Sequence, residues 1–208
     1  RDSPYTMDAA VDQLFLFLDA LDVDKVVLVG NSYGGVLALE AALAEPERVD
    51  ALVLADAAVY VEEELPEWLM NLPQVRRLGP LLARQLGQSE AFVRQTYVDP
   101  ERISAERMDQ TLIHTQVEDW DLALWEYLRV WGVGAPDTAT YVAQVGQPTL
   151  VISGDGDAVV PIADSQRLYS ALPNAELAIL SACGHVPQEE CPDAFEAAVD
   201  GWLGQLAE

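Results

Sequence analysis

The chain has 208 residues, of which half are apolar and 22% are charged, a composition typical of a globular domain with a substantial core. Its formal net charge of −24 leaves too few cations to neutralise phosphates, which excludes nucleic acid as a partner and disfavours an anionic membrane surface. No stretch is apolar and long enough to span a bilayer, and no signal-peptide pattern is visible in the sequence. We therefore expect a cytoplasmic, acidic protein that acts on a small molecule.

Two cysteines, Cys183 and Cys191, are too few to form a disulfide framework. Their spacing matches no zinc-ligand pattern, and only one histidine lies near them in the sequence. We interpret both as free thiols in a reducing compartment.

The first half of the chain predicts a helix, a strand and a second helix. Thr6 is typical of a helix N-cap, and apolar residues then recur at helical spacing as far as Leu21. A valine-rich run over 26–29 predicts a buried strand, and 34–43 predicts a helix that ends near Pro46.

Three further strands are predicted at 51–55, 149–153 and 175–180. Helices are predicted near 163–172 and from Pro192 onward, since proline is favoured in the first turn of a helix. Strands that alternate with helices are typical of the α/β class, with a mostly parallel sheet covered by helices on both faces.

The stretch 62–144 breaks this alternation, because it has helical patterns and no good strand. We interpret it as a helical cap inserted over the functional edge of the sheet. The predicted organisation is therefore a core part at 1–61, the cap at 62–144 and a second core part at 145–208. Large aromatic residues are interpreted as the cap's own core: Trp120, Trp125 and Trp131.

The motif Gly30-Asn31-Ser32-Tyr33-Gly34-Gly35 lies between a predicted strand and helix, the context in which G-x-S-x-G forms a nucleophile elbow. The tight turn strains the backbone of Ser32 and exposes its hydroxyl. We expect Gly30 and Gly34 to be required there, because a Cβ would collide with neighbouring backbone. The N–H of Tyr33, at the start of the helix, is predicted to stabilise an oxyanion. An ordinary turn is the alternative interpretation.

A serine hydroxyl is a weak nucleophile and needs a general base. The chain has two histidines. His185 follows the last predicted strand, and sites collect in the loops at the carboxyl ends of parallel strands, so His185 is predicted as the base. His114 lies within a helical pattern and is interpreted as a surface or boundary residue.

Three aspartates are candidates for the acid that orients the base. Asp155 and Asp157 follow the strand at 149–153, and Asp56 follows the strand at 51–55. The order Ser, Asp, His favours Asp157, which precedes the Val160-Pro161 pair that starts the next helix. Asp56 and Asp155 remain alternatives, since solvated loop carboxylates are common.

Four segments resemble the α/β-hydrolase superfamily, in its cap-bearing branch of small esterases and carbon–carbon bond hydrolases: 30–35, 46–49, 154–161 and 184–189. The resemblance implies a serine hydrolase that cleaves a carboxylic ester of a small or medium apolar substrate through an acyl-enzyme, with a catalytic triad and no metal or organic cofactor. Carbon–carbon bond hydrolysis of vinylogous diketones by the same triad is one alternative. A non-catalytic binding module with this fold is another.

Two residues narrow the range of activities that the resemblance implies. Ser32 stands where the epoxide hydrolases and haloalkane dehalogenases of the superfamily carry an aspartate, which argues against both activities. The carbon–carbon hydrolases share Gly-Asn-Ser at the elbow but usually carry Trp after the histidine. Val186 occupies that position here, which favours the ester.

The superfamily's sheet has eight strands, and its nucleophile follows the fifth. Here Ser32 follows the first recognisable strand, and Arg1-Asp2-Ser3-Pro4 resembles the continuation of a loop. We therefore expect a fragment of a longer protein that lacks the N-terminal strands and the second oxyanion donor. The strand at 26–29 would then need to pair with the missing segment or with a second copy of the chain.

Overall fold

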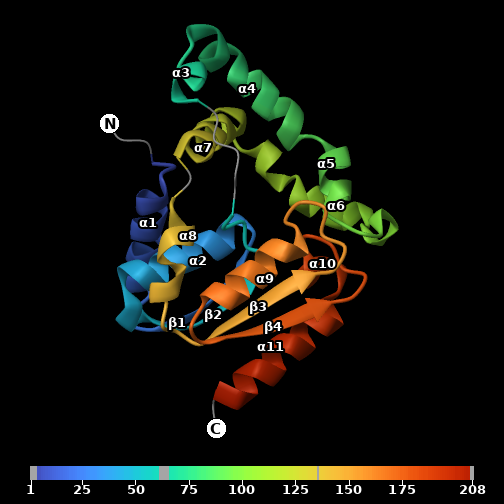
Figure 1. Cartoon of the computed structure of the whole chain (residues 1–208). Helices are drawn as coiled ribbons and strands as arrows, with labels where there is room; N and C mark the ends of the chain where they lie inside the picture. The colour runs from blue at the N-terminus through green and yellow to red at the C-terminus, as the bar shows by residue number, and fades with distance from the viewer. Residues whose placement is uncertain (1–3, 61–65, 135, 207–208) are drawn as a thin grey trace. The chain divides into compact units, whose positions relative to one another are not determined.

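The computed structural model describes residues 4–60, 66–134 and 136–206 (Figure 1). The chain divides into two compact units. The core unit comprises Val11–Tyr60, Thr96–Asp99 and Asp137–Glu208, and the helical unit comprises Arg1–Ala10, Val61–Gln95 and Pro100–Pro136, each within the described residues. The predicted boundary at 61/62 lies outside the described residues, as do residues 1–3, and the boundary at 144/145 stays a prediction.

The core unit contains a four-stranded parallel sheet. Its strands are β1 (Val26–Asn31), β2 (Val49–Ala55), β3 (Thr149–Gly154) and β4 (Ala175–Leu180), in the order β1-β2-β3-β4. All four predicted strands are confirmed, each within two residues of its predicted bounds. Because the strands are parallel, their carboxyl ends lie at one edge of the sheet.

Burial differs between the central and the outer strands. β2 and β3 are almost fully buried, whereas β1 and β4 border the described sheet and are buried only in part. Val27 and Val29 are 42% and 59% exposed, so the expectation of a buried first strand is wrong. An edge strand has a neighbour on one side alone, which its apolar sequence does not reveal.

The longer helices around the sheet are α1 (Met7–Ala20), α2 (Tyr33–Ala44), α9 (Ile162–Ala171) and α11 (Pro192–Leu206). Figure 1 shows α2 and α9 on one face of the sheet and α11 on the other. The predicted N-cap of α1 is confirmed, because the hydroxyl of Thr6 accepts a hydrogen bond from the N–H of Ala9 at 3.3 Å. The buried face of α1 follows the predicted spacing: Met7, Val11, Phe15 and Leu18.

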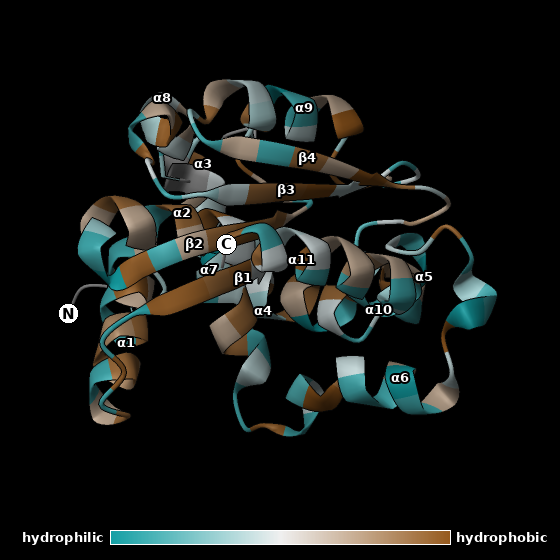
Figure 2. Ribbon diagram, turned by 90° about the horizontal axis from the view of Figure 1, so that it is seen from below, coloured by the Kyte–Doolittle hydropathy of each residue, from teal (hydrophilic) through white to brown (hydrophobic). Residues whose placement is uncertain are grey.

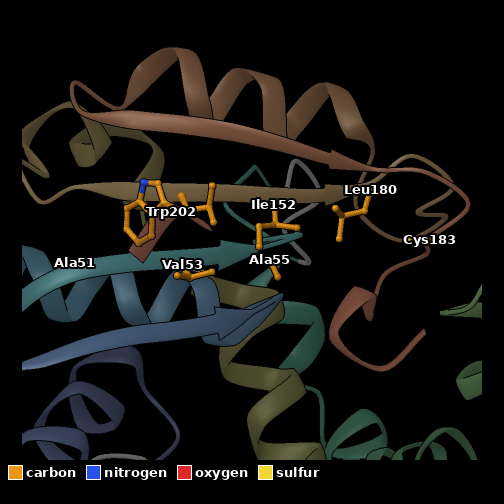
Figure 3. Packing of buried hydrophobic residues seen from close by; sticks show 8 residues of the cluster. Ala51, Val53, Ala55, Ile152, Leu180, Cys183 and Trp202 are labelled. Atoms are coloured by element: carbon orange, nitrogen blue, oxygen red, sulfur yellow. The ribbon is translucent and has the colours of Figure 1, made fainter. Parts of the chain in front are cut away.

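Alternate residues of β2 and β3 face α11, which carries Trp202 into the same layer (Figure 3). This follows from the two-residue period of a strand, which sends successive side chains to opposite faces. The cluster is apolar throughout: Ala51, Val53, Ala55, Leu150, Ile152, Leu180, Cys183 and Trp202. In Figure 2, most of β1 and β2 is brown, the colour of hydrophobic residues.

The helical unit has no strand among its described residues, as predicted. Its helices are α3 (Glu67–Met70), α4 (Pro73–Gly87), α5 (Glu90–Gln95), α6 (Ala105–Thr111) and α7 (Trp120–Gly134). Short helices α8 (Thr138–Tyr141) and α10 (Pro187–Glu190) belong to the core unit. Four 3-10 turns complete the list: Pro46–Arg48, Pro100–Arg102, Ile113–Gln116 and Val142–Gln144.

Trp125 forms the core of the helical unit together with Met70 and Ala83. A Cβ on Gly79 would lie 2.1 Å from the Trp125 ring, so α4 and α7 approach closely at this glycine. Trp120 and Trp131 are half-buried. No helix within the described ranges has the length and apolar character needed to cross a membrane.

Candidate active site

Ser32 lies at the junction of β1 and α2 with φ 54° and ψ −118°, a backbone conformation that residues other than glycine rarely adopt. Its N–H donates to the carbonyl of Ala55 at 2.9 Å, and its carbonyl accepts from the N–H of Ala58 at 3.2 Å. These bonds to the last residue of β2 and to the loop after it hold the strained turn in place. The strand–turn–helix elbow predicted from the sequence is therefore present.

The glycines of the elbow have different roles. A Cβ on Gly30 would lie 2.2 Å from the carbonyl oxygen of Gly34, and a Cβ on Gly35 would lie 2.5 Å from the Cβ of Ala57. A Cβ on Gly34 would meet nothing within 4 Å, so the expectation that Gly34 is required is wrong. Gly34 lies in the first turn of α2 with its missing side chain directed into open space.

Tyr33 is the first residue of α2, a helix of 12 residues. The N–H groups of a first helical turn have no acceptor within the helix and point along its axis toward negative charge. The backbone of Tyr33 is therefore placed at the end of the helix where an anion is stabilised. Burial raises the pKa of its side-chain hydroxyl, which stays neutral at physiological pH.

His185 and Asp157 are joined by a hydrogen bond of 2.8 Å between Nδ1 and Oδ2. The side chain of His185 is 8% exposed and that of Asp157 is fully buried. Burial opposes the charge on Asp157, but hydrogen bonds from His185 and from the N–H groups of Val159 and Val160 hold the pKa of this carboxyl below its usual value. An ionised Asp157 fixes the proton of neutral His185 on Nδ1 and leaves Nε2 as the basic nitrogen.

The two alternative aspartates have hydrogen-bond partners other than His185. Asp155 accepts hydrogen bonds from the N–H of Ala182 at 2.7 Å and from the hydroxyl of Ser181 at 3.1 Å, so it joins the loops after β3 and β4. Asp56 is fully buried and accepts from the hydroxyl of Ser153. Of the three candidates, Asp157 is the one that the described structure brings into contact with His185.

Three hydrogen bonds hold the backbone around His185. Its N–H donates to the carbonyl of Thr96 at 2.8 Å, and the preceding N–H, of Gly184, donates to Glu190 at 2.7 Å. Its carbonyl accepts from the side-chain amide of Asn31 at 2.8 Å. Since Asn31 precedes Ser32, this bond joins the elbow to the histidine loop.

Glu190 is a buried carboxylate that sequence reasoning missed. Besides Gly184, it accepts hydrogen bonds from the N–H groups of Val98 and Asp99, at 3.1 and 2.8 Å. It thereby joins α10 and the histidine loop to the segment Thr96–Asp99. In the sequence it stands beside Glu189 in an acidic run that is typical of a solvated surface, so no local signal distinguishes it.

Cys183 and Cys191 form a disulfide with a Cα–Cα distance of 6.1 Å, so the expectation of free thiols is wrong. The chain passes through His185 and α10 between the two cysteines. The return of the chain over this loop brings them together, and a spacing of eight residues by itself does not predict it.

His114 is exposed on the helical unit, as predicted. Its Nδ1 lies 3.2 Å from the carbonyl of Thr111, and its ring packs edge-on against Trp120. Within the described ranges, no group of three or more His, Cys, Asp or Glu side chains is arranged to hold a metal ion.

Comparison with known proteins shows the family to which the chain belongs. The family model of the α/β hydrolase fold matches residues 1–192. The 2-hydroxymuconate semialdehyde hydrolase of Pseudomonas sp. (strain CF600) is 32% identical over 207 residues, covering 98% of this chain and 71% of that protein. The 2-hydroxy-6-oxononadienedioate/2-hydroxy-6-oxononatrienedioate hydrolase of Paraburkholderia phymatum is 31% identical over 192 residues, covering 90% of this chain and 65% of that protein.

Solved structures of hydrolases have a similar fold. The meta-cleavage product hydrolase CumD of Pseudomonas fluorescens IP01 has a TM-score of 0.79 and 25% identity, covering 99% of this chain and 74% of that chain. A thermophilic esterase of Thermogutta terrifontis has a TM-score of 0.72 and 26% identity, covering 96% of this chain and 72% of that chain. With its elbow, its parallel sheet and the match over residues 1–192, this chain belongs to the α/β-hydrolase fold family, in the branch that resembles the meta-cleavage product hydrolases.

Proposed function

We propose that this hydrolase acts through Ser32 as nucleophile, His185 as general base and Asp157 as the acid that orients the base. The observation that carries the proposal is the 2.8 Å hydrogen bond between the buried Asp157 and Nδ1 of His185. The Asn31 bond supports it, because it holds the His185 loop against the residue that precedes Ser32.

In the first half of the proposed reaction, His185 Nε2 takes the hydroxyl proton as Ser32 attacks a carbonyl carbon. The Tyr33 N–H and the positive end of α2 stabilise the oxyanion that forms. Its collapse breaks the bond to the leaving group, which takes the proton from the imidazolium. Water activated by His185 then attacks the acyl-enzyme, releases the carboxylic acid and restores Ser32.

We infer that the bond broken is a carbon–carbon bond of a vinylogous diketone. The curated relatives named above are hydrolases of such ring-cleavage products, so they support this alternative better than the carboxylic ester expected from the sequence. A carbon leaving group must carry the electron pair of the broken bond until it is protonated. A conjugated dienoate can do so by delocalisation, which explains why this substrate class suits a serine triad.

Ester hydrolysis is the second candidate. Two observations favour it: Val186 follows the histidine, where the carbon–carbon hydrolases usually carry Trp, and an esterase is among the similar structures at 26% identity. Both candidates share the same acyl-enzyme half-reaction, so the substrate alone distinguishes them.

The test compares kcat/KM of the full-length protein for a 2-hydroxy-6-oxo-dienoate and for a p-nitrophenyl ester. We expect the dienoate to be the better substrate, and we expect Ser32→Ala to lower turnover of both by roughly 10³ to 10⁶. Ser170→Ala, on the exposed side of α9, is the matched control and should leave turnover unchanged. Activity of Ser32→Ala within about tenfold of the wild type would contradict the assignment.

A further inference from the structure

Asp56 is a buried carboxyl group that the proposed mechanism does not use. It follows β2 with a positive φ of 44°, and its N–H donates to the carbonyl of Ile152 at 2.9 Å. The residue is fully buried, and none of the ion pairs among the described residues includes it. A buried carboxylate without a cation is strongly disfavoured relative to its protonated form, so the environment selects the neutral acid.

The hydrogen bonds that Asp56 accepts fall mainly on one of its two carboxyl oxygens. Its Oδ1 accepts from the hydroxyl of Ser153 at 3.0 Å and from the N–H of Gly154 at 3.2 Å. Its Oδ2 lies 3.5 Å from the same N–H, at the limit of a hydrogen bond. This asymmetry fits a carbonyl oxygen at Oδ1 and a hydroxyl at Oδ2, since an acid accepts mainly through its carbonyl.

The end of β3 brings Asp56 and Asp157 together, because Gly154 donates its N–H to Asp56 at 3.2 Å and accepts at its carbonyl from the N–H of Asp157 at 3.3 Å. The charge of Asp157 and a side-chain hydrogen bond with it both raise the pKa of Asp56. Two carboxylates in contact repel each other, so one of the pair retains a proton. Asp157 already accepts from His185 and from two backbone N–H groups, which stabilise its charged form. The proton of the pair therefore resides on Asp56.

We propose that Asp56 is a positioning residue whose protonated carboxyl donates a hydrogen bond to Asp157 and holds that carboxylate against Nδ1 of His185. The proposal rests on the proposed function, because it assigns a partner to the acid of that triad. It also explains why an aspartate rather than an apolar residue follows β2 at this buried position, since a donor stabilises the nearby carboxylate.

Asp56 can donate this hydrogen bond only while its carboxyl group is protonated. Burial, the charge of Asp157 and the contact with it together raise the pKa of Asp56 to about 8, against the opposing hydrogen bonds from Ser153 and Gly154. Among the described residues, the titratable group that acts on Asp56 is Asp157 on the loop after β3, and His185 on the loop after β4 contacts Asp157 in turn. The residues of β3 itself are all neutral. Loss of the Asp56 proton converts its hydrogen bond to Asp157 into repulsion, so reactivity should fall on the alkaline side.

The experiment measures the rate constant at which a fluorophosphonate labels Ser32 in the full-length protein, from about pH 6 to pH 10. The wild-type rate should fall on the alkaline side as Asp56 ionises. Asp56→Asn stays neutral and keeps a donor, so it should retain the rate at pH 7 within about threefold and lack the alkaline fall. Asp56→Leu keeps the approximate shape without a donor and should lose about tenfold or more at pH 7.

Asp155→Asn is the matched control, because Asp155 lies on the same loop as Asp157 but binds Ala182 and Ser181. Its pH profile should follow that of the wild type. Superposed wild-type and Asp56→Asn profiles would overturn the role of Asp56. A wild type that is never labelled at Ser32 would overturn the proposed function instead, so the two failures are distinguishable.

A second measurement does not depend on the folding of any variant. Carbon-13 NMR of wild-type protein labelled at the aspartate carboxyls should show one carboxyl that is still protonated at neutral pH. A spectrum in which every aspartate is ionised at neutral pH would overturn the proposal.

Discussion

The side-chain amide of Asn31 donates a hydrogen bond of 2.8 Å to the backbone carbonyl of His185, across 154 residues of sequence. The same amide donates to the carbonyl of Ala55 at 3.1 Å. One side chain therefore joins the ends of β1 and β2 to the loop after β4. Because Ser32 is the next residue, this pair of bonds relates the proposed nucleophile to the proposed base.

Asn31→Ala should lower the free energy of unfolding by about 1–3 kcal/mol, because two carbonyl groups lose their donor. It should also lower kcat more than it changes KM, since the loop that carries His185 loses its tie to the elbow. Urea denaturation and steady-state kinetics measure the two effects. Asn174→Ala, at an exposed position before β4, is the control. Wild-type kcat in Asn31→Ala would show that the tie does not position His185.

Gly30 and Gly34 form a matched pair of positions in the elbow. Gly30→Ala should prevent the native turn, because its Cβ would lie 2.2 Å from the backbone of Gly34. Gly34→Ala meets open space in a helix and should raise the free energy of unfolding by about 0.5–1 kcal/mol. Soluble yield and thermal unfolding measure both. Equal effects of the two substitutions would contradict the steric argument.

Asp157→Asn should lower kcat by about 10⁴, because an amide can stabilise the wrong tautomer of His185 and cannot stabilise the imidazolium. Asp155→Asn removes a carboxylate two residues away that braces the Ala182 backbone, so kcat should change by less than about tenfold. The same substrate and the same pH serve for both variants. If Asp155→Asn were the more damaging of the two, the acid would be misassigned.

Reduction of the Cys183–Cys191 disulfide should lower the free energy of unfolding by about 2–3 kcal/mol, the chain-entropy effect expected for a loop of this size. The measurement is urea denaturation with and without a reductant. A variant that combines Cys183→Ser with Cys191→Ser should be insensitive to the reductant. Two titratable thiols in the native, non-reduced protein would contradict the bond.

The stability of the protein should depend on pH through Asp56. The pKa of this carboxyl is about 8 in the folded protein, raised by burial and by Asp157. In the unfolded chain it is about 3.9, so between the two values the folded state binds a proton that the unfolded state has released. The stability contributed by Asp56 is therefore full at low pH and is lost as the pH rises through this window.

Asp56→Asn cannot ionise and isolates this effect. Its free energy of unfolding relative to the wild type should increase as the pH rises through the window and level off above about pH 8. Urea denaturation at a series of pH values gives the comparison. A difference that does not change with pH would show that Asp56 is ionised in the folded protein.

Local patterns in the sequence were sufficient to predict much of the fold. Runs of valine, leucine and isoleucine predicted β2 and β3 because these strands are buried on both faces, and the spacing of apolar residues predicted α1 and α11. The apolar run of β1 by itself predicted burial, whereas the place of β1 at the border of the described sheet decides its exposure. The elbow at Ser32 was predictable because strand, turn and helix are consecutive in the chain.

By itself the sequence determined the alternation of strands and helices, and therefore the placement of Ser32, Asp157 and His185 after strands that end at one edge. Only the tertiary structure decided which aspartate meets His185, that Glu190 and Asn31 hold its loop, and that Cys183 pairs with Cys191. Hydrophobic periodicity is a local property that nearby residues encode. A contact between distant loops depends instead on the order, twist and packing of the whole sheet, which no short stretch of the chain specifies.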